Sequence, residues 1–272
     1  MSVTQFGLMV EGKTADDVFT KWVSILQQYG TYDEVDESRD GAIVGECLNA
    51  VTEIEDPTRC FMKNKIRKMP TRYALGEMLW YLHAGRDIKS IQLYTHNWDR
   101  MSDDGMNVNS NYGYCIRDKY GFDQLESVLE LLEDDPSTRQ AVIHIKEPQE
   151  YKGLGNRSND INCTVCLQFF IRDEKLYMTT YMRSNDLWLG FPFDVFQFTS
   201  LQVYMAMELG VGLGTYTHIA GSLHLYKRDY LKLKANEEAI ERDNRAQQLY
   251  KQVESGEATV TYAPENPGKV KV

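Results

Sequence analysis

The sequence predicts an α+β fold in which helices pack on a large, mixed central sheet. Helical and strand patterns intermix without the regular alternation of a doubly wound sheet. Hydrophobic residues make up 42% of the 272 positions, which is enough to close a large core. No stretch rich in Pro, Gly or Ser indicates a linker, and no repeat with a period of roughly 20 to 50 residues occurs. We therefore expect one domain, residues 1–272.

Five segments carry apolar residues at helical spacing. The first begins where Thr14 and Asp17 form a cap pair, and it stops at Gly30. The second, TRYALGEMLWYLH, is apolar almost all round, which predicts a buried helix. We expect helices over residues 14–29, 71–83, 123–134, 194–208 and 228–255.

Aromatic and β-branched residues predict the strands. CTVCLQFFI and LYMTTYM flank the turn RDEK and are typical of a β-hairpin. Further strands are expected for AVIHIK, for GTYTHIAGSLHLY and, late in the chain, for ATVTYA. Residues 31–68 and 230–272 contain no motif that indicates chemistry.

Charge and composition exclude several classes of protein. Lys and Arg number 30 against 40 Asp and Glu, and the net charge of −10 disfavours direct binding to nucleic acid. No run of about 18 apolar residues predicts a membrane span. The first residues, MSVTQFGLMVEGKTADD, lack the basic and apolar regions of a secretory signal. Five cysteines, an odd count, favour free thiols in a reducing compartment, so we expect a cytoplasmic protein.

Cys163 and Cys166 form a CxxC pair, which could be a redox couple or half of a metal site. On a strand, residues three apart point to opposite faces, so the two sulfurs should diverge. A second CxxC is also missing, and we expect no metal. Cys166 is then a small core residue. Cys163 opens the strand after the polar loop SNDIN, where a thiol can face a cleft.

The segment MRSNDLWLGFPFD, residues 182–194, is the most informative in the chain. Arg183 and Ser184 at a strand end can bind an oxyanion, because a guanidinium offers a planar fork and a hydroxyl adds a donor. Asp194 stands where a helix is expected to begin. Taken alone, a surface salt bridge explains Arg183 equally well, and a helix cap explains Asp194.

Two other features point to a site. Glu77 lies on the apolar helix 71–83, and a buried carboxylate is costly unless it is used or paired. His224 and Tyr226 alternate on a predicted strand, so their rings should face the same side. A satisfied pair in the core is the alternative for these two rings.

Taken together, these motifs resemble those of the thymidylate synthase superfamily. They follow one another in the same order as in that superfamily, from about residue 70 to about residue 230. The resemblance implies that superfamily's α+β fold, with a face of the sheet forming a homodimer interface. The matching motifs are GEMLWYL around Glu77, NWD at Trp98, NSNYG at Tyr112, DPSTR before Gln140, Cys163, MRSND, LGFPFD and GSLHLY.

Several details are more similar to the deoxycytidylate hydroxymethylases of this superfamily than to its methylating enzymes. Thymidylate synthases carry Pro-Cys-His at the nucleophile, whereas this chain has Asn162-Cys163-Thr164. They end the LGxPF segment with Asn, where this chain has Asp194. The C-terminal ENPGKVKV also lacks the short apolar tail of methylating enzymes. These departures favour hydroxymethylation over hydride transfer.

The change from Asn to Asp alters which pyrimidine base the residue can recognise. Uracil presents a carbonyl at position 4 and an N3 hydrogen, which an amide can satisfy. Cytosine presents an amino group at position 4 and an unprotonated N3, which suit a carboxylate that accepts from the amino group and shares a proton with N3. Asp194 therefore favours cytosine.

The resemblance implies a mechanism with 5,10-methylenetetrahydrofolate as co-substrate. Cys163, as a thiolate favoured by the charge of Arg183, adds to C6 of the pyrimidine, and C5 then attacks the one-carbon unit. Loss of the C5 proton and departure of tetrahydrofolate leave an exocyclic methylene, and water adds to it, giving 5-hydroxymethyl-dCMP. Glu77 is implied as acid/base and water-ordering group, and Tyr112 and Asp186 as groups that order the ring and its waters.

The resemblance also implies binding residues. The phosphate would be held by Arg183, Ser184, Arg39 and, from the other subunit of a homodimer, Arg139. The sugar hydroxyl would be held by His224 and Tyr226, and the folate by Trp98, Asp186, Gly190 and Phe193. Family members have two successive arginines where this chain has Arg139 and Gln140, so one phosphate contact is missing or replaced.

Alternatives remain open on the same scaffold and outside it. A deoxyuridylate or cytidylate hydroxymethylase and a thymidylate synthase would share most of these motifs. A nucleotide-binding protein without catalysis, or a thiol-redox protein that uses Cys163 and Cys166, belongs to a different class.

Overall fold

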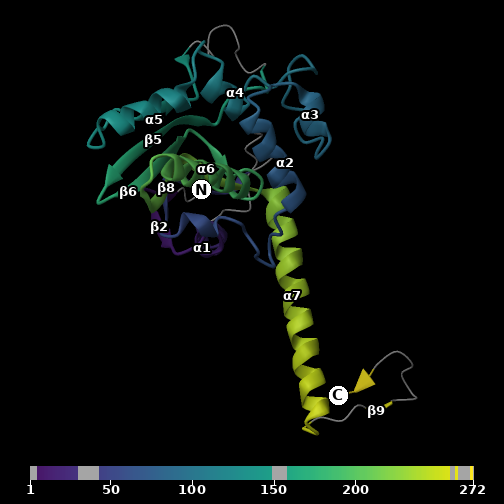
Figure 1. Ribbon diagram of the computed structural model, residues 1–272. Coiled ribbons are helices and arrows are strands. Elements are labelled where there is room, and N and C mark those ends of the chain that lie inside the picture. Colours follow the sequence, from purple (N-terminus) through teal and green to yellow (C-terminus); the bar gives the residue numbers. More distant parts are fainter. Residues whose placement is uncertain (1–4, 30–42, 149–157, 258–260, 263–269, 272) are drawn as a thin grey trace.

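A computed structural model describes residues 5–29, 43–148, 158–257, 261–262 and 270–271 (Figure 1). The helices are α1 (Ala15–Tyr29), α2 (Thr71–Leu82), α3 (Ile88–Gln92), α4 (Tyr112–Arg117), α5 (Gln124–Asp134), α6 (Phe191–Glu208) and α7 (Lys227–Glu254), with a 3-10 turn η1 (Pro57–Arg59). The strands are β1 (Gln5–Phe6), β2 (Met9–Gly12), β3 (Ile43–Ile54), β4 (Val142–His144), β5 (Thr164–Arg172), β6 (Lys175–Met182), β7 (Asn185–Asp186), β8 (Gly212–Tyr226), β9 (Thr261–Tyr262) and β10 (Val270–Lys271).

The predicted α+β class is confirmed, because most strands join one mixed sheet. Its order is β1-β3-β8-β6-β5-β4, with β2 also paired to β3 and β7 to β8. Strands β3 and β8 are antiparallel, whereas β6 and β8 are parallel. The expected hairpin is β5–β6, and Asp173 and Glu174 at its tip have φ values of 50° and 57°. Two left-handed residues in a row suit the right-handed twist of the two strands.

Helices α1 and α6 pack on the same face of the sheet. Trp22 of α1 donates a hydrogen bond of 2.8 Å to Thr52 of β3. Phe191 of α6 lies edge-on to His218 of β8, with 5.4 Å between the ring centroids. Thr52 and His218 are cross-strand partners, and directly opposite partners point to one face. This face therefore holds the main core.

The opposite face carries the alternate residues of the same strands. Phe170 of β5 is paired with Tyr177 of β6, and Thr179 and Tyr181 follow at spacing two. All four are half-buried rather than enclosed. This face thus combines aromatic and β-branched side chains.

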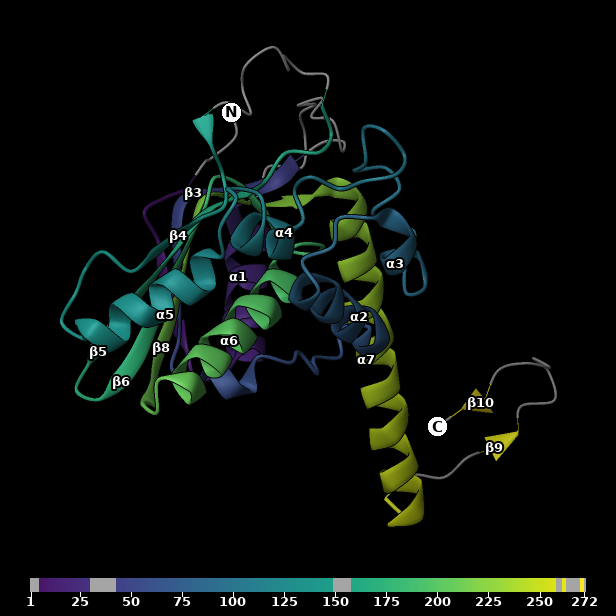
Figure 2. The ribbon, with the colours of Figure 1, turned by 45° about the horizontal axis from the view of Figure 1, so that its top comes forward.

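Most predicted helices are confirmed within a few residues. Asp123 caps α5 through bonds to two backbone amides, as the DQ boundary suggests. α6 starts at Phe191, three residues before the predicted start, because Pro192 is tolerated in a first turn. The charged segment forms α7, which extends far from the rest of the molecule (Figures 1 and 2). The late strand is confirmed as β9, although the rest of ATVTYA lies outside the described residues.

The prediction of a fully buried second helix is wrong. Leu75, Leu79 and Leu82 of α2 are 48%, 47% and 52% exposed. Only the face with Glu77 and Trp80 turns inward, where both side chains are buried. The apolar pattern therefore belongs to a helix that leaves one apolar face exposed. Among the described helices, none has both the length and the apolar character that a membrane crossing needs.

Candidate active site

Cys163 immediately precedes β5 and is partly exposed. Arg183 immediately follows β6, the antiparallel partner of β5, so strand pairing brings the two residues together. The Arg183 amide donates to the Cys163 carbonyl at 2.8 Å, and its Nη2 lies 3.7 Å from the Cys163 sulfur. A guanidinium at a thiol favours the thiolate, which is the nucleophilic form.

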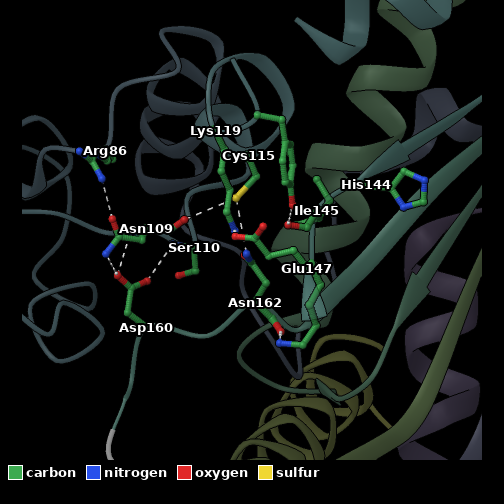
Figure 3. A network of polar contacts seen from close by, with 12 residues as sticks. Arg86, Asn109, Ser110, Cys115, Lys119, His144, Ile145, Glu147, Asp160 and Asn162 are labelled. Atoms are coloured by element: carbon green, nitrogen blue, oxygen red, sulfur yellow. Dashed lines mark hydrogen bonds and ion pairs between the residues drawn. The ribbon is translucent and has the colours of Figure 1, made fainter. Parts of the chain in front are cut away.

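The loop that leads into Cys163 is held by buried and charged groups (Figure 3). Asp160 accepts backbone N–H bonds from Asn109 and Ser110 at 2.6 and 2.8 Å. Asn162 is 2% exposed, and its amide donates to the sulfur of Cys115 at 3.5 Å. These contacts join the nucleophile's loop to the segment that enters α4.

α4 supplies Tyr112 at its first position. Asn111 caps the helix, since its side chain accepts from the Tyr114 amide at 2.8 Å. A Cβ on Gly113 would lie 1.9 Å from the Tyr81 carbonyl oxygen of α2, so only glycine permits this approach of the two helices. The NYG sequence therefore fixes where the Tyr112 ring stands.

Tyr112 connects the predicted nucleophile with the predicted base-recognition residue. Its hydroxyl donates to Oδ1 of Asp194 at 3.4 Å. Burial raises the pKa of Tyr112 well above its ordinary value, and the charges of Asp194 and Cys163 raise it further. Asp194 and Cys163, two predicted site residues, thus both act on the phenol of the third, Tyr112.

Asp194 stands in the first turn of α6, but Gly190 is the N-cap of that helix. Its Oδ2 accepts a hydrogen bond of 2.7 Å from the side-chain amide of Asn185. Burial, followed by the charge of Glu77, raises the pKa of Asp194 to about 7. A Cβ on Gly190 would lie 3.1 Å from both Asn185 Nδ2 and Asp194 Oδ2, so glycine leaves room for this pair.

Glu77 is buried, as expected, and both of its carboxylate oxygens accept hydrogen bonds. Oε1 accepts from the Tyr73 hydroxyl at 2.6 Å and from Trp98 Nε1 at 3.2 Å. Oε2 accepts from the Gln197 amide at 3.3 Å. Burial raises the pKa of Glu77 to about 7, and these bonds oppose the rise. A carboxyl group that titrates near neutrality can exchange protons in a reaction.

Aromatic rings surround Glu77. Tyr73 meets the ring of Phe193 edge-on at 4.6 Å, and Trp98 meets Trp80 edge-on at 5.3 Å. Arg67, which the sequence did not single out, places its guanidinium 5.7 Å from the Phe193 ring. Trp98 and Phe193, both predicted folate contacts, therefore lie in one aromatic cluster beside the Glu77 carboxylate.

His224 and Tyr226 face the same side of β8, with 5.0 Å between their ring centroids. Asp186 is the register partner of His224, because β7 pairs with the end of β8. Its Oδ1 accepts from the amides of Trp188 and Leu189 at 2.8 and 3.0 Å. Ser184 lies just before β7 and is half-buried. Strand pairing thus places the predicted sugar and phosphate residues at one end of the sheet.

Arg139 does not join this group within one chain. It is exposed, and its carbonyl accepts from the side chain of Gln168. Gln168 is five residues along β5 from Cys163, which corresponds to roughly 17 Å at the usual rise of a strand. Arg39, the other predicted phosphate ligand, lies outside the described residues.

Cys163 and Cys166, as a CxxC pair, could be half of a metal site or a redox couple. Within the described ranges, no group of three or more His, Cys, Asp or Glu is arranged to hold a metal ion. Neither Cys163 nor Cys166 forms a disulfide, and burial raises the pKa of Cys166. A poorly ionised thiol is a weak partner for thiol exchange.

The sequence did not single out the residues that support the predicted ones. Asn185 was quoted within MRSND, yet its bond to Asp194 spans nine positions and depends on the turn between β7 and α6. Gln197 lies on α6, 120 positions from Glu77. A polar residue on an otherwise buried helix was the available signal for Gln197.

Known proteins that are similar to this chain point to one family. The family profile described as thymidylate synthase matches residues 20–260. A deoxyuridylate hydroxymethyltransferase of Bacillus phage SP01 is 35% identical over 201 residues, covering 70% of this chain and 52% of that protein. This chain thus spans about half the length of that relative. A putative thymidylate synthase of Methanocaldococcus jannaschii is 30% identical over 194 residues, covering 69% of this chain and 79% of that protein.

A solved structure shares the fold. The thermostable thymidylate synthase A of Bacillus subtilis superposes with a TM-score of 0.64 at 23% identity, covering 81% of this chain and 83% of that chain. The arrangement of Cys163, Arg183, Tyr112 and Asp194 thus occurs on the sheet and helices of that fold. From the match over residues 20–260, the chain belongs to the thymidylate synthase family.

Proposed function

We propose that the protein transfers a one-carbon unit from 5,10-methylenetetrahydrofolate to C5 of dCMP and adds water, giving 5-hydroxymethyl-dCMP and tetrahydrofolate. One observation carries the choice of base. By the resemblance of LGFPFD, a carboxylate, Asp194, stands where the methylating members of the superfamily carry an amide, and the Tyr112 hydroxyl donates to it. This proposal makes the protein a hydroxymethyltransferase.

Recognition of cytosine follows from the chemistry of Asp194. With a pKa of about 7, the group is available both as an acceptor and as a protonated donor near neutrality. It can then accept from the 4-amino group and donate to N3. An ionised carboxylate against the uracil O4 would oppose two acceptors, which costs on the order of 1 to 3 kcal/mol in a water-poor site.

Cys163 is the proposed nucleophile, and Arg183 the group that stabilises its thiolate. Attack of the thiolate at C6 forms a carbon–sulfur bond and makes C5 nucleophilic. This bond breaks again when the product is released. Arg183 and Ser184 are then the proposed phosphate ligands, and His224 with Tyr226 the proposed sugar contacts. Asp186 orders the ring and its waters at the same end of the sheet.

The folate site is proposed at the aromatic cluster of Trp98, Tyr73 and Phe193. Flat rings that meet edge-on beside a carboxylate suit a pteridine, which offers both a π-face and hydrogen-bonding edges. Bound methylenetetrahydrofolate supplies the carbon that becomes the hydroxymethyl group. Glu77 is placed to hold water and to move the proton that this hydration needs, because its pKa is near 7.

A second candidate is hydroxymethylation of dUMP. The 35% identical relative from phage SP01 is called a deoxyuridylate hydroxymethyltransferase, which favours that base. The presence of Asp194 favours cytosine instead. Both candidates share the addition of water.

The test is a product assay on the purified protein. It is incubated with methylenetetrahydrofolate and dCMP, dUMP or CMP in turn, and the product nucleotide is identified by mass. We expect the mass of a hydroxymethyl group added to dCMP, with tetrahydrofolate released. Methylation of dUMP with dihydrofolate formed would identify a thymidylate synthase, and binding of a nucleotide without turnover would leave only a binding protein.

The variant Asp194→Asn separates the two bases. An amide can serve both uracil groups, so we expect kcat/KM for dCMP to fall and that for dUMP to rise, each by about 10-fold or more. The control is Glu126→Gln on the exposed face of α5, which should change neither value. Unchanged preference in Asp194→Asn would contradict the assignment of Asp194.

We also propose a homodimer that pairs through the sheet face of Phe170, Tyr177 and Tyr181, and that lends Arg139 to its partner's phosphate site. Arg139 is exposed and far from Cys163 of its own chain, which supports such an exchange. Mixing inactive Cys163→Ala with weak Arg139→Ala should restore activity, since one site of each mixed dimer is intact. Absence of recovery in a verified mixed dimer would contradict the exchange. We also propose a cytoplasmic location, because the proposed nucleophilic thiol of Cys163 suits a reducing compartment.

A further inference from the structure

A chain of buried polar groups extends behind Asp194, away from the nucleophile. The Asn185 amide nitrogen lies 2.7 Å from Oδ2 of Asp194, and its Oδ1 lies 3.1 Å from Nε2 of His218. Nδ1 of His218 lies 2.9 Å from the Tyr216 hydroxyl, which lies 3.0 Å from the Thr180 hydroxyl. The four supporting residues are at most 2% exposed. The proposed mechanism uses none of them.

The hydrogen bonds in this series of polar groups run in one direction, and His218 is the first residue that sets it. Burial lowers the pKa of His218 to about 3, so the ring is neutral and has one donor and one acceptor nitrogen. Asn185 presents its carbonyl oxygen, which can only accept, so Nε2 carries the proton. Nδ1 is then the acceptor and takes the proton of the Tyr216 hydroxyl.

Thr180, at the far end of this series of polar groups, disfavours the reverse direction of the hydrogen bonds. In reverse, Tyr216 would donate to Thr180, and the Thr180 proton would need another acceptor. Thr180 is fully buried, and in the part of the chain that the structure describes, Tyr216 is its hydrogen-bond partner and no other is found. A buried hydroxyl without an acceptor costs about 1 to 3 kcal/mol. With Nε2 protonated, His218 and Asn185 both donate toward Asp194, and the Tyr216 hydroxyl, which lies within reach of both Thr180 and Nδ1, gives its one proton to Nδ1.

This direction decides what Asp194 can present. Oδ2 meets the Asn185 amide nitrogen, which can only donate, whereas Oδ1 meets the Tyr112 hydroxyl, which can turn and accept. A proton taken up by the carboxyl group is therefore favoured on Oδ1. A carboxylic acid without such a constraint has two forms, one with the proton on each oxygen. One form matches the amino and N3 edge of cytosine, and the other matches the carbonyl and N–H edge of uracil. If Oδ1 faces N3 of the proposed substrate, the form with the proton on Oδ1 is the one that pairs with cytosine.

We propose that Asn185 and His218 are specificity-determining positioning residues, which hold Asp194 in the single carboxyl form that pairs with cytosine. This inference rests on the proposed function, because the function sets which base lies against Asp194. Neither residue needs to touch the nucleotide. The effect should therefore appear in the choice of base more than in the rate with the preferred base.

The experiment compares kcat/KM for dCMP and dUMP in three variants of the full chain. His218→Phe keeps a planar ring but cannot donate to Asn185, and we expect the dCMP to dUMP ratio to fall about 10-fold. His218→Gln retains an amide donor, and we expect it to keep the ratio within about 3-fold of the unsubstituted protein. Ser127→Ala removes a hydroxyl on α5 whose hydrogen bond goes to the Asp123 carbonyl of the same helix start, and it should not change the ratio.

A fall of both kcat/KM values by the same factor in His218→Phe would overturn the inference, because it indicates a structural effect alone. If the unsubstituted protein prefers dUMP, the proposed function fails. In that case the assignment of the fixed form to cytosine fails as well, but a ratio that moves toward one in His218→Phe would still show that Asn185 and His218 set the choice of base.

A spectroscopic measurement on the unsubstituted protein covers the case in which His218→Phe does not fold. Nitrogen-15 NMR of histidine side chains distinguishes the two neutral forms, and His218→Gln assigns the signal. We expect the Nε2–H form at neutral pH. The Nδ1–H form would overturn the inference, since the chain would then run away from Asp194.

Discussion

Arg183 reaches two groups around Cys163 with one guanidinium. Its Nη2 lies 3.7 Å from the sulfur, while its Nε donates to the carbonyl of Asn162 at 3.0 Å. The first contact acts on the charge of the nucleophile, and the second fixes the loop that carries it. Two functions in one planar group explain why another cation is a poor replacement.

We expect Arg183→Lys to slow alkylation of Cys163 by iodoacetamide by about 10-fold at pH 7, because one ammonium cannot reach both atoms. The rate is measured by mass spectrometry of the peptide that contains Cys163. Arg172→Lys at the far end of the hairpin is the matched control and should react at the original rate. Equal rates in all three proteins would show that Arg183 does not act on the sulfur.

Cys163→Ala should abolish turnover, because no other group can form the covalent bond to C6. Binding of dCMP should persist, as the sheet end with His224 and Tyr226 is untouched. Isothermal titration measures the binding, and a 5-fluoro analogue supplied with folate tests for a covalent complex by mass. The complex should form in Cys166→Ser and be missing in Cys163→Ala; the reverse pattern would move the nucleophile to Cys166.

Glu77→Gln should change how stability depends on pH. In the unfolded chain the carboxyl group titrates near its ordinary pKa of 4.5, whereas in the folded protein the pKa is about 7. Below pH 4.5 both states are protonated and burial costs nothing extra. As the pH rises to 7 and above, the folded state is increasingly penalised, by on the order of 3 kcal/mol in total.

Urea unfolding at pH 4.5 and pH 8 measures this effect. The unfolding free energy of Glu77→Gln minus that of the unsubstituted protein should increase between the two pH values, since glutamine does not titrate. Glu126→Gln on the surface provides the control and should show a flat difference. A difference for Glu77→Gln that is the same at both pH values would contradict the raised pKa.

Gly113→Ala should destabilise the protein by roughly 1 to 3 kcal/mol, because the added Cβ would overlap the Tyr81 carbonyl oxygen. α4 must then move away from α2, which displaces Tyr112 from Asp194. Chemical unfolding and kcat measure the two effects. Gly85→Ala is the control, since its Cβ would meet its nearest neighbour at an ordinary 3.5 Å. Equal stabilities of the two variants would disprove the close approach.

Local patterns were enough to predict the β5–β6 hairpin, α5 and the long helix α7, since turn residues, caps and periodicity act over a few positions. They did not predict β3, whose 12 residues form the antiparallel partner of β8. Apolar and polar residues alternate only weakly in β3, and its place in the sheet depends on partner strands far along the sequence. The burial of α2 was also misjudged, because an apolar pattern does not reveal which faces find a partner.

The sequence by itself determined the chemistry available, since side chains such as Cys163, Glu77 and Asp194 carry their reactivity wherever they lie. It also determined the order of motifs that placed the chain in its family. Only the tertiary structure decided which groups act together, because Asn185, His218 and Gln197 support the site through contacts that span 9 to 120 positions. Such contacts arise when strands pair and helices pack, and no local pattern in the chain records them.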